Sequence, residues 1–144
     1  MNAKVHMHLS VRNLETSKAF YAKFLGAPVK DLVGYAKFLP EFAPLNLALS
    51  QGRRDAPPER LHTGIQVETP AEVMAHLARV TAAGLAVREE LGVDCCHANQ
   101  DKFWVTDPDG LEWEVYHLNY DLEPKAKRFT GFALPMVAAM GVCS

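Results

Sequence analysis

Thiols are the most reactive side chains in this chain, and two of its three cysteines, Cys95 and Cys96, are adjacent. We expect a cytoplasmic protein, in which an odd number of cysteines favours free thiols with a chemical role over a disulfide framework. The competing interpretation is that these are buried structural thiols. The pair is the first candidate for a binding group, and Cys143 is the candidate for a third thiol if the end of the chain folds back.

A second group of candidates follows from a spacing that occurs twice. His6 lies five residues before Val11, and His62 lies five residues before Val67. If two similar modules pack as pseudo-symmetric halves, these histidines face each other across a central groove. Glu114 is the best carboxylate to complete the set, because its two apolar neighbours would occupy the other face of an alternating strand.

Two histidines and one carboxylate bind divalent first-row metals and leave positions open, the use that non-haem Fe(II) oxygenases make of them. Zinc, manganese, nickel and cobalt fit the same ligands, so the residue types do not choose the metal. Glu112 shares a face with Glu114, and His8 shares a face with His6, so both remain alternatives. Two other histidines are expected to be structural or solvated: His76 and His117.

The elements that would position these residues also repeat. In the first half, an alternating strand over 4–11 leads into a helix over 13–26, with Asn13 as its N-cap and Gly26 just past its end. In the second half, a strand over 61–67 leads into a helix with a Thr69 cap and a capping box. Short apolar runs predict three strands in each half, at 27–32, 35–39, 45–50, 85–91, 102–106 and 111–118.

This order predicts an α+β fold of two βαβββ modules, at about 4–50 and 61–118, that form one domain over 1–120. A chain of 144 residues with 49% hydrophobic content suits one compact core. We expect a long loop around 91–100 to carry the cysteine pair. The tail over 121–144 has no counterpart in either module.

The composition excludes several classes of partner. A formal net charge of -2 gives no basic face for nucleic acid, and no run of like charges indicates an anionic membrane surface. The first ten residues lack the order of a signal peptide, and the apolar stretch at 132–142 is too short to span a bilayer. We therefore expect a small-molecule ligand and a cytoplasmic protein, with a homodimer left open.

One long segment carries a family resemblance. The two-module plan, the histidine-to-valine strand starts and DPDGLEWEVY resemble the glyoxalase/bleomycin-resistance/extradiol-dioxygenase superfamily, also called vicinal-oxygen-chelate proteins, over about residues 4–118. The longer run CCHANQDKFWVTDPDGLEWEVY, at 95–116, resembles the carbon–arsenic lyases of that superfamily and the related cadmium-induced proteins. In those lyases vicinal cysteines bind trivalent organoarsenicals beside an Fe(II) site, and dioxygen is used to break the carbon–arsenic bond.

Carried over by position, the resemblance implies that Cys95 and Cys96 bind arsenic and that His62 and Glu114 are metal ligands, with His6 in the third ligand position. Adjacent thiols suit As(III), which is thiophilic and has two exchangeable positions. A thiol of pKa about 8.5 is mostly protonated at neutral pH, and coordination removes that proton.

This chain also departs from the family pattern. Some of the lyases have glutamine where this chain has His6, so its metal preference can differ. The loop has Asp94 and His97 where small polar and aromatic residues are common, and we expect His97 to be solvated. Three residues after the pair are candidates for hinging or orienting the loop: Gln100, Asp101 and Lys102.

The resemblance thus predicts an Fe(II)- and dioxygen-dependent lyase that converts methyl- or arylarsenite to arsenite. Two other classes stay open. One is a protein that sequesters cadmium or arsenic without turnover, and the other is a glutathione-using enzyme of the same superfamily in which the cysteine pair is incidental.

Overall fold

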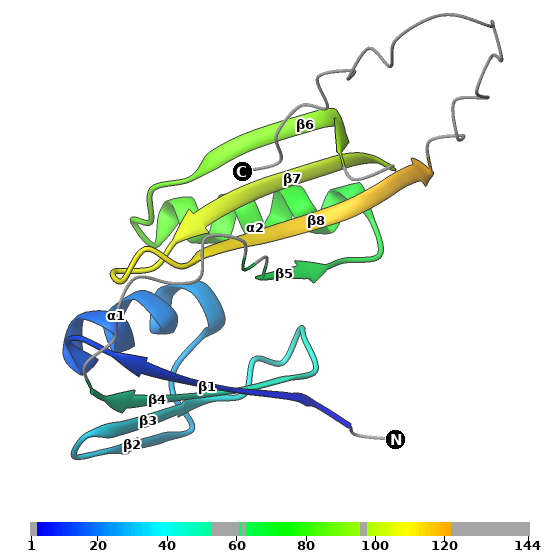
Figure 1. The fold of residues 1–144 in the computed structure, drawn as a ribbon. Helices are drawn as coiled ribbons and strands as arrows, with labels where there is room; N and C mark the ends of the chain where they lie inside the picture. The colour runs from blue at the N-terminus through cyan, green and yellow to red at the C-terminus, as the bar shows by residue number, and fades with distance from the viewer. Residues whose placement is uncertain (1–2, 53–60, 62, 96–97, 122–144) are drawn as a thin grey trace, which may run out of the picture.

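The computed structural model describes residues 3–52, 61, 63–95 and 98–121, which form two four-stranded sheets and two helices (Figure 1). The strand order is β1-β4-β3-β2 in the first sheet and β5-β8-β7-β6 in the second, so the predicted pair of βαβββ modules is confirmed. The elements are β1 (Val5–Val11), α1 (Leu14–Leu25), β2 (Lys30–Leu32), β3 (Tyr35–Phe38), β4 (Leu45–Gln51), β5 (Thr63–Gln66), α2 (Pro70–Ala82), β6 (Arg88–Cys95), β7 (Ala98–Thr106) and β8 (Glu112–Asp121).

Both modules share one pairing scheme. The first strand of each pairs in parallel with the last strand, β1 with β4 and β5 with β8, while the other pairs are antiparallel. The parallel pairs require a crossover, and the helix of each module supplies it. As a result β1 and β5 are edge strands of their sheets.

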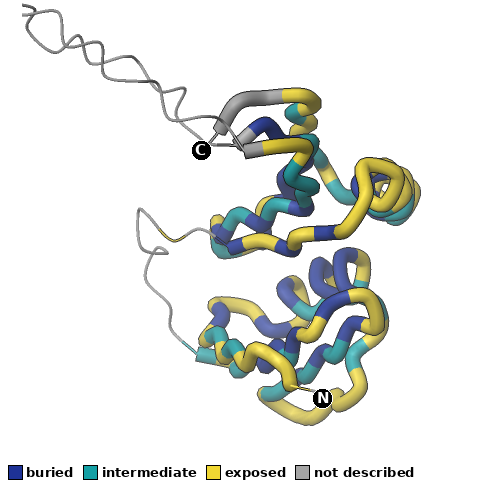
Figure 2. The backbone as a smooth tube through the Cα atoms, turned by 90° about the vertical axis from the view of Figure 1, so that its right-hand side faces the viewer, coloured by how far each residue is buried: buried dark blue, intermediate teal, exposed yellow. Residues whose placement is uncertain are grey.

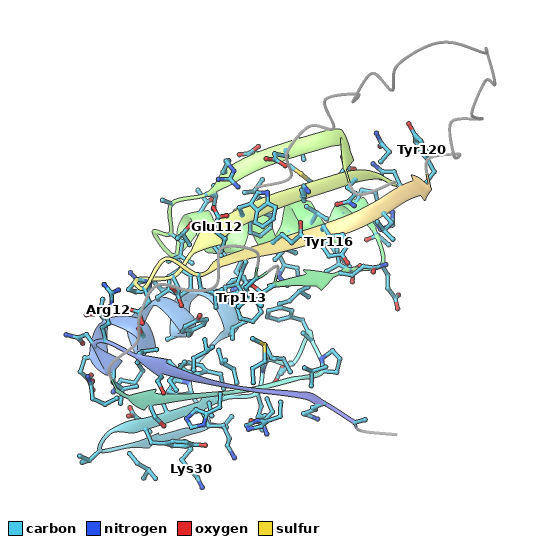
Figure 3. All side chains as sticks on the ribbon, in the orientation of Figure 1. Arg12, Lys30, Glu112, Trp113, Tyr116 and Tyr120 are labelled. Carbon is cyan, nitrogen blue, oxygen red and sulfur yellow. The ribbon has the colours of Figure 1, made fainter. Side chains whose placement is uncertain are left out.

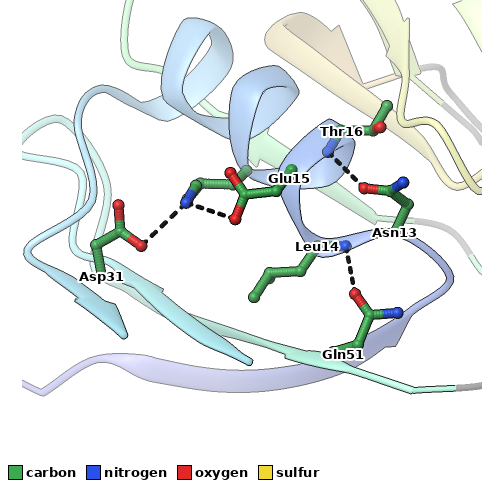
Figure 4. A network of polar contacts seen from close by, with 7 residues as sticks. Asn13, Leu14, Glu15, Thr16, Asp31 and Gln51 are labelled. Atoms are coloured by element: carbon green, nitrogen blue, oxygen red, sulfur yellow. Dashed lines mark hydrogen bonds and ion pairs between the residues drawn. The ribbon is translucent and has the colours of Figure 1, made fainter. Parts of the chain in front are cut away.

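The start of α1 is fixed by polar side chains, which Figure 4 shows from close by. The Asn13 side chain accepts a hydrogen bond from the Thr16 N–H at 3.0 Å, as predicted for the N-cap. Gln51, at the end of β4, accepts from the Leu14 N–H at 2.8 Å and donates to the Arg12 carbonyl at 2.6 Å. These hydrogen bonds therefore connect the start of α1 to β4, the last strand of the first module.

The capping box predicted for α2 is also present. The Thr69 hydroxyl accepts from the Glu72 N–H at 3.2 Å, and the Glu72 carboxylate accepts from the Thr69 N–H at 2.9 Å. The chain leaves the helix at Gly84, whose φ of 88° suits glycine. Neither α1 nor α2 is long and apolar enough to cross a membrane.

The two modules meet through α1, which lies between the two sheets (Figure 1). Tyr21 donates a hydrogen bond to the Asp107 carboxylate at 2.8 Å and accepts one from the Trp113 indole at 3.1 Å. The Trp113 ring also packs edge-on against Tyr21 and Phe24. All four side chains are buried, and Figure 2 shows such buried segments in both modules. The chain therefore has one continuous core.

A second link between the modules runs from α2 to the end of α1. The Arg79 guanidinium donates to the carbonyls of Lys23 and Phe24 at 3.1 and 2.8 Å. The same group lies 3.2 Å from His76 Nδ1 and 5.2 Å from the centre of the Phe42 ring. Burial, and then the charge of Arg79, lower the pKa of His76 below its usual value.

The prediction of a long loop around residues 91–100 is wrong. β6 runs to Cys95 and β7 begins at Ala98, so most of this segment is a hairpin with paired backbone groups. Its polar composition concealed the strands, because β6 is an edge strand with few apolar contacts and its register shifts between Glu90 and Val93. The predicted tail, from residue 122 on, lies outside the described residues.

Candidate functional site

Glu114 lies in β8, on the face of the second sheet that does not pack on α2. Its strand neighbours Trp113 and Val115 are buried in the core, as the alternation predicted. Figure 3 labels Glu112 and Tyr116, which flank Glu114 on its own face. The Glu114 side chain is only 12% exposed, and its Oε2 atom is buried and receives no hydrogen bond from any described residue. A carboxylate withdrawn from water, whose buried Oε2 has only an ion pair with Lys102 at 3.4 Å, suits a bound cation.

A row of alternating charges crosses the same face. Lys102 Nζ lies 3.4 Å from Glu114 and 3.8 Å from Glu90. Arg88 lies 3.7 Å from Glu90 and 3.2 Å from Glu112. Lys102 is fully buried, which is rare for lysine unless it is paired.

Both cations of this row contact one aromatic ring. Trp104 is opposite Glu114 in the β7–β8 register, and it is buried. Arg88 lies 5.3 Å and Lys102 lies 5.2 Å from the centre of its ring. Cation–π contacts of this kind help to fix the positions of both charges, of which Lys102 is buried and Arg88 is 46% exposed.

Gly64, in β5, makes room for the Glu114 side chain. The two residues are partners in the parallel β5–β8 register. A Cβ atom on Gly64 would lie 2.6 Å from Glu114 Cγ and 3.2 Å from Oε1. The carboxylate therefore lies directly over Gly64. His62, the ligand predicted two residues earlier, lies outside the described residues.

The two histidines of β1 differ in how their ring nitrogens are used. His6 Nδ1 lies 3.1 Å from the Asn46 carbonyl, so this nitrogen is the donor and Nε2 is left as a lone-pair donor to a metal. A backbone carbonyl on the second nitrogen is the usual support of a metal-binding histidine. His8 instead uses Nε2, which lies 2.7 Å from the Ser50 hydroxyl. The hydrogen bonds therefore favour His6 over His8 as a ligand.

The structure does not bring His6 and Glu114 together within one chain. Met7 and Leu9 of β1 pack on the core beside α1, so His6 and His8 are on the opposite, exposed face of the first sheet. Since α1 lies between the sheets, that face points away from the second sheet (Figure 1). Among the described residues no three histidine, cysteine, aspartate or glutamate side chains gather at one point.

Comparison with known proteins places this geometry in a family. The model of the Glyoxalase/Bleomycin resistance protein/Dioxygenase superfamily matches residues 4–115. The chain belongs to this superfamily. A crystal structure of a superfamily member from Alicyclobacillus acidocaldarius has the same fold, with a TM-score of 0.67 and 15% sequence identity over 82% of this chain and 92% of that one.

Within the superfamily, two similar proteins carry more specific names. A trivalent organoarsenical cleaving enzyme from Bacillus sp. (strain MD1) is 45% identical over 120 residues, which are 82% of this chain and 74% of the relative. Cadmium-induced protein CadI from Mycobacterium tuberculosis (strain ATCC 25618 / H37Rv) is 39% identical over 122 residues, 84% of this chain and 80% of the relative. These are the two branches that the segment at 95–116 resembles.

The residues predicted to hinge or orient the thiol loop are in strand β7 instead. Gln100 is buried, and Asp101 accepts a hydrogen bond from the Gly92 N–H at 2.7 Å across the hairpin. Lys102 belongs to the charged row described above. Their period-two spacing puts Gln100 and Lys102 on one face, and the polar sequence hid this alternation. The backbone of Cys95 pairs with Ala98 at the end of the hairpin.

The other predicted thiol residues, Cys96 and Cys143, lie outside the described residues, as does His97.

An apolar cleft of about 500 Å³ lies between the edge strands β1 and β5. Val5 and Met7 form one wall, and Leu61, Ile65 and Trp113 are on the other side. These side chains are mostly apolar, so the cleft suits an organic group.

Sequence reasoning missed Gly64, which makes room for Glu114, and Arg88, which pairs with Glu90 and Glu112 in the charged row. Gly64 carried a usable signal, because a glycine inside a strand often marks a close approach of another group. Arg88 carried none, since a single arginine in a polar stretch is usually solvated.

Proposed function

We propose that this protein cleaves the carbon–arsenic bond of trivalent organoarsenicals and releases arsenite. The observation that carries the proposal is 45% identity with a named trivalent organoarsenical cleaving enzyme over 82% of this chain. The adjacent thiols of Cys95 and Cys96 supply the chemistry that such a substrate needs, since two thiolates can hold one As(III) centre. Cytoplasmic conditions would keep them reduced.

For methylarsenite, a balanced reaction with one dioxygen gives arsenous acid and formaldehyde. The carbon atom loses four electrons, dioxygen gains them, and arsenic stays trivalent. Holding arsenic at two sulfur atoms leaves the carbon–arsenic bond as the group presented to the oxidant. The thiols would therefore bind and orient the substrate and would not be consumed.

The metal that we propose is Fe(II), with His6, His62 and Glu114 as its ligands. Two observations support this donor set: the buried Glu114 Oε2 has no hydrogen bond from a described residue, and His6 has Nε2 available. Fe(II) would supply the binding and activation of dioxygen. Glu114 would contribute an anionic oxygen, and Lys102 would hold that carboxylate in place. Mn(II), Co(II), Ni(II) and Zn(II) fit the same donors.

We also propose that the complete site forms between two copies of the chain. The support is that the His6 face points away from the Glu114 face within one chain, although His6 Nε2 and the Glu114 carboxylate are both suited to bind metal. Mixing a His6→Ala variant with a Glu114→Ala variant tests this directly. If sites are shared, mixed dimers regain one intact metal site out of two. If the mixture binds no more metal than either variant alone, the site lies within one chain.

A second candidate function is sequestration of cadmium or arsenic without turnover. The 39% identity with CadI favours it, because that relative is named for induction by cadmium. The two functions differ in whether arsenite is released and dioxygen is consumed. A sequestering protein would bind Cd(II) or As(III) stoichiometrically and consume no dioxygen.

The deciding experiment supplies Fe(II)-loaded protein with methylarsenite, with and without dioxygen. We expect arsenite release and dioxygen uptake in a one-to-one ratio, and no release under anaerobic conditions. Cys95→Ser and Cys96→Ser should each abolish release but retain Fe(II), because a hydroxyl is a poor ligand for a soft centre. Cys143→Ser is the matched control and should change release little. Full turnover by both adjacent-cysteine variants would refute the proposed thiol role.

A further inference from the structure

Glu114 has neighbours on two sides, and one of them is a residue without a side chain. We propose that Gly64 is a positioning residue, whose missing Cβ lets the Glu114 carboxylate lie across β5 in the orientation that binds metal. This inference rests on the proposed metal site. It adds a residue that contacts neither substrate nor metal but decides where the carboxylate is.

Glycine is needed at position 64 because a Cβ atom there would occupy the space of the Glu114 side chain. Glycine in a strand interior weakens the strand, because it lacks packing and loses more backbone entropy. The backbone at Gly64 gives no separate reason for glycine, since its φ is not among the positive values found at five other glycines of the described residues. The Cβ that any other residue would add meets Glu114 Cγ at 2.6 Å, closer than real Cβ contacts allow.

The Glu114 side chain has little freedom to retreat from such a Cβ. On the other side of β8 lies β7, with the buried Trp104 opposite Glu114 and the buried Lys102 next to it. Lys102 Nζ is already 3.4 Å from Glu114 Oε2. An added Cβ would therefore push the carboxylate towards Lys102 and away from β5, the strand that His62 immediately precedes in sequence.

Moving the Glu114 carboxylate would weaken metal binding, because ligand atoms must be held close to the positions in which they coordinate the metal. Changes to groups that orient a ligand commonly weaken metal binding by about 10- to 100-fold. A Gly64→Ala variant is accordingly expected to bind metal at least about tenfold more weakly, at the low end of that range.

Gly52→Ala is the matched control. Gly52 also lacks a positive φ, and its added Cβ would be crowded, at 3.2 Å from Ser10 Cβ, but it does not meet Glu114. Both variants and the wild type are titrated with Co(II) and with Fe(II) without dioxygen. We expect Gly52→Ala to stay within about twofold of the wild type. Wild-type affinity in Gly64→Ala overturns the inference.

A second measurement needs no metal. Unfolding by urea in the presence of a chelator is compared for wild type, Gly64→Ala, Glu114→Ala and the double variant. If Glu114 is the group that an added Cβ meets, Gly64→Ala lowers the stability of the wild type and lowers that of Glu114→Ala much less. Equal losses in both backgrounds overturn the inference. Failure of the wild type to bind Co(II) or Fe(II) refutes the proposed metal site instead, and the cycle still tests the contact.

Discussion

Replacing Lys102 by methionine tests the charged row that holds Glu114. Methionine is unbranched, only one atom shorter than lysine and uncharged, so this change leaves Glu114 without the Lys102 cation. Coulomb's law for the 3.4 Å pair gives about 5 kcal/mol at an effective dielectric constant of 20. Relief of the desolvation of Lys102 offsets part of this, and breaking a buried pair commonly costs about 3–5 kcal/mol. Glu90 adds little, because its side chain is 27% exposed.

We therefore expect Lys102→Met to lower the free energy of unfolding by about 3 kcal/mol. The measurement is urea unfolding of the metal-free protein at pH 7. The control is Lys102→Met combined with Glu114→Gln, in which the neutral amide needs no counter-ion, and we expect it to regain most of the loss. A double variant as unstable as Lys102→Met alone would show that the loss comes from packing around Trp104 and refute the electrostatic argument.

Three further predictions concern the ligands, the pH dependence and the contact between modules. His6→Ala should weaken Co(II) binding at least about tenfold while His8→Ala leaves it within about twofold; the reverse order in a titration would contradict the assignment of Nε2. Because the folded-state pKa of His76 is lowered, its contribution to stability is complete above the unfolded pKa of about 6.5 and declines as pH falls below it. Urea midpoints at pH 7.5 and 5.5 should accordingly fall more for the wild type than for His76→Gln, and equal falls would exclude this histidine as a source. Tyr21→Phe leaves the buried Asp107 carboxylate and the Trp113 indole each short of a partner, so thermal unfolding should show a loss of about 2 kcal/mol; an unchanged melting temperature would mean that the network adds no stability.

Local signals predicted the fold well because they coincide with the physical forces that set it. The caps at Asn13 and Thr69 were both confirmed. The apolar alternation around Glu114 also assigned its face correctly, since Trp113 and Val115 are buried.

The site was less predictable, because its arrangement depends on long-range packing. The repeat around His6 and His62 predicted a shared groove. However, α1 packs on the face of the first sheet that is directed towards the second sheet, and His6 lies on the other face. The burial of Lys102 depends on strands β6 and β8, which neutralise it from both sides. No local pattern distinguishes such a lysine from a solvated one.

Because α1 lies between the sheets, we expect it to tolerate fewer substitutions than α2. Six of the 12 residues of α1 are buried, whereas three of the 13 residues of α2 are. Substitutions should therefore accumulate faster over 70–82 than over 14–25 as such proteins diverge. A single module also cannot be an autonomous ancestor in its present form, because without Trp113 it would expose the aromatic rings of Tyr21 and Phe24 to water. Each half therefore depends on the other to keep its aromatic rings out of water.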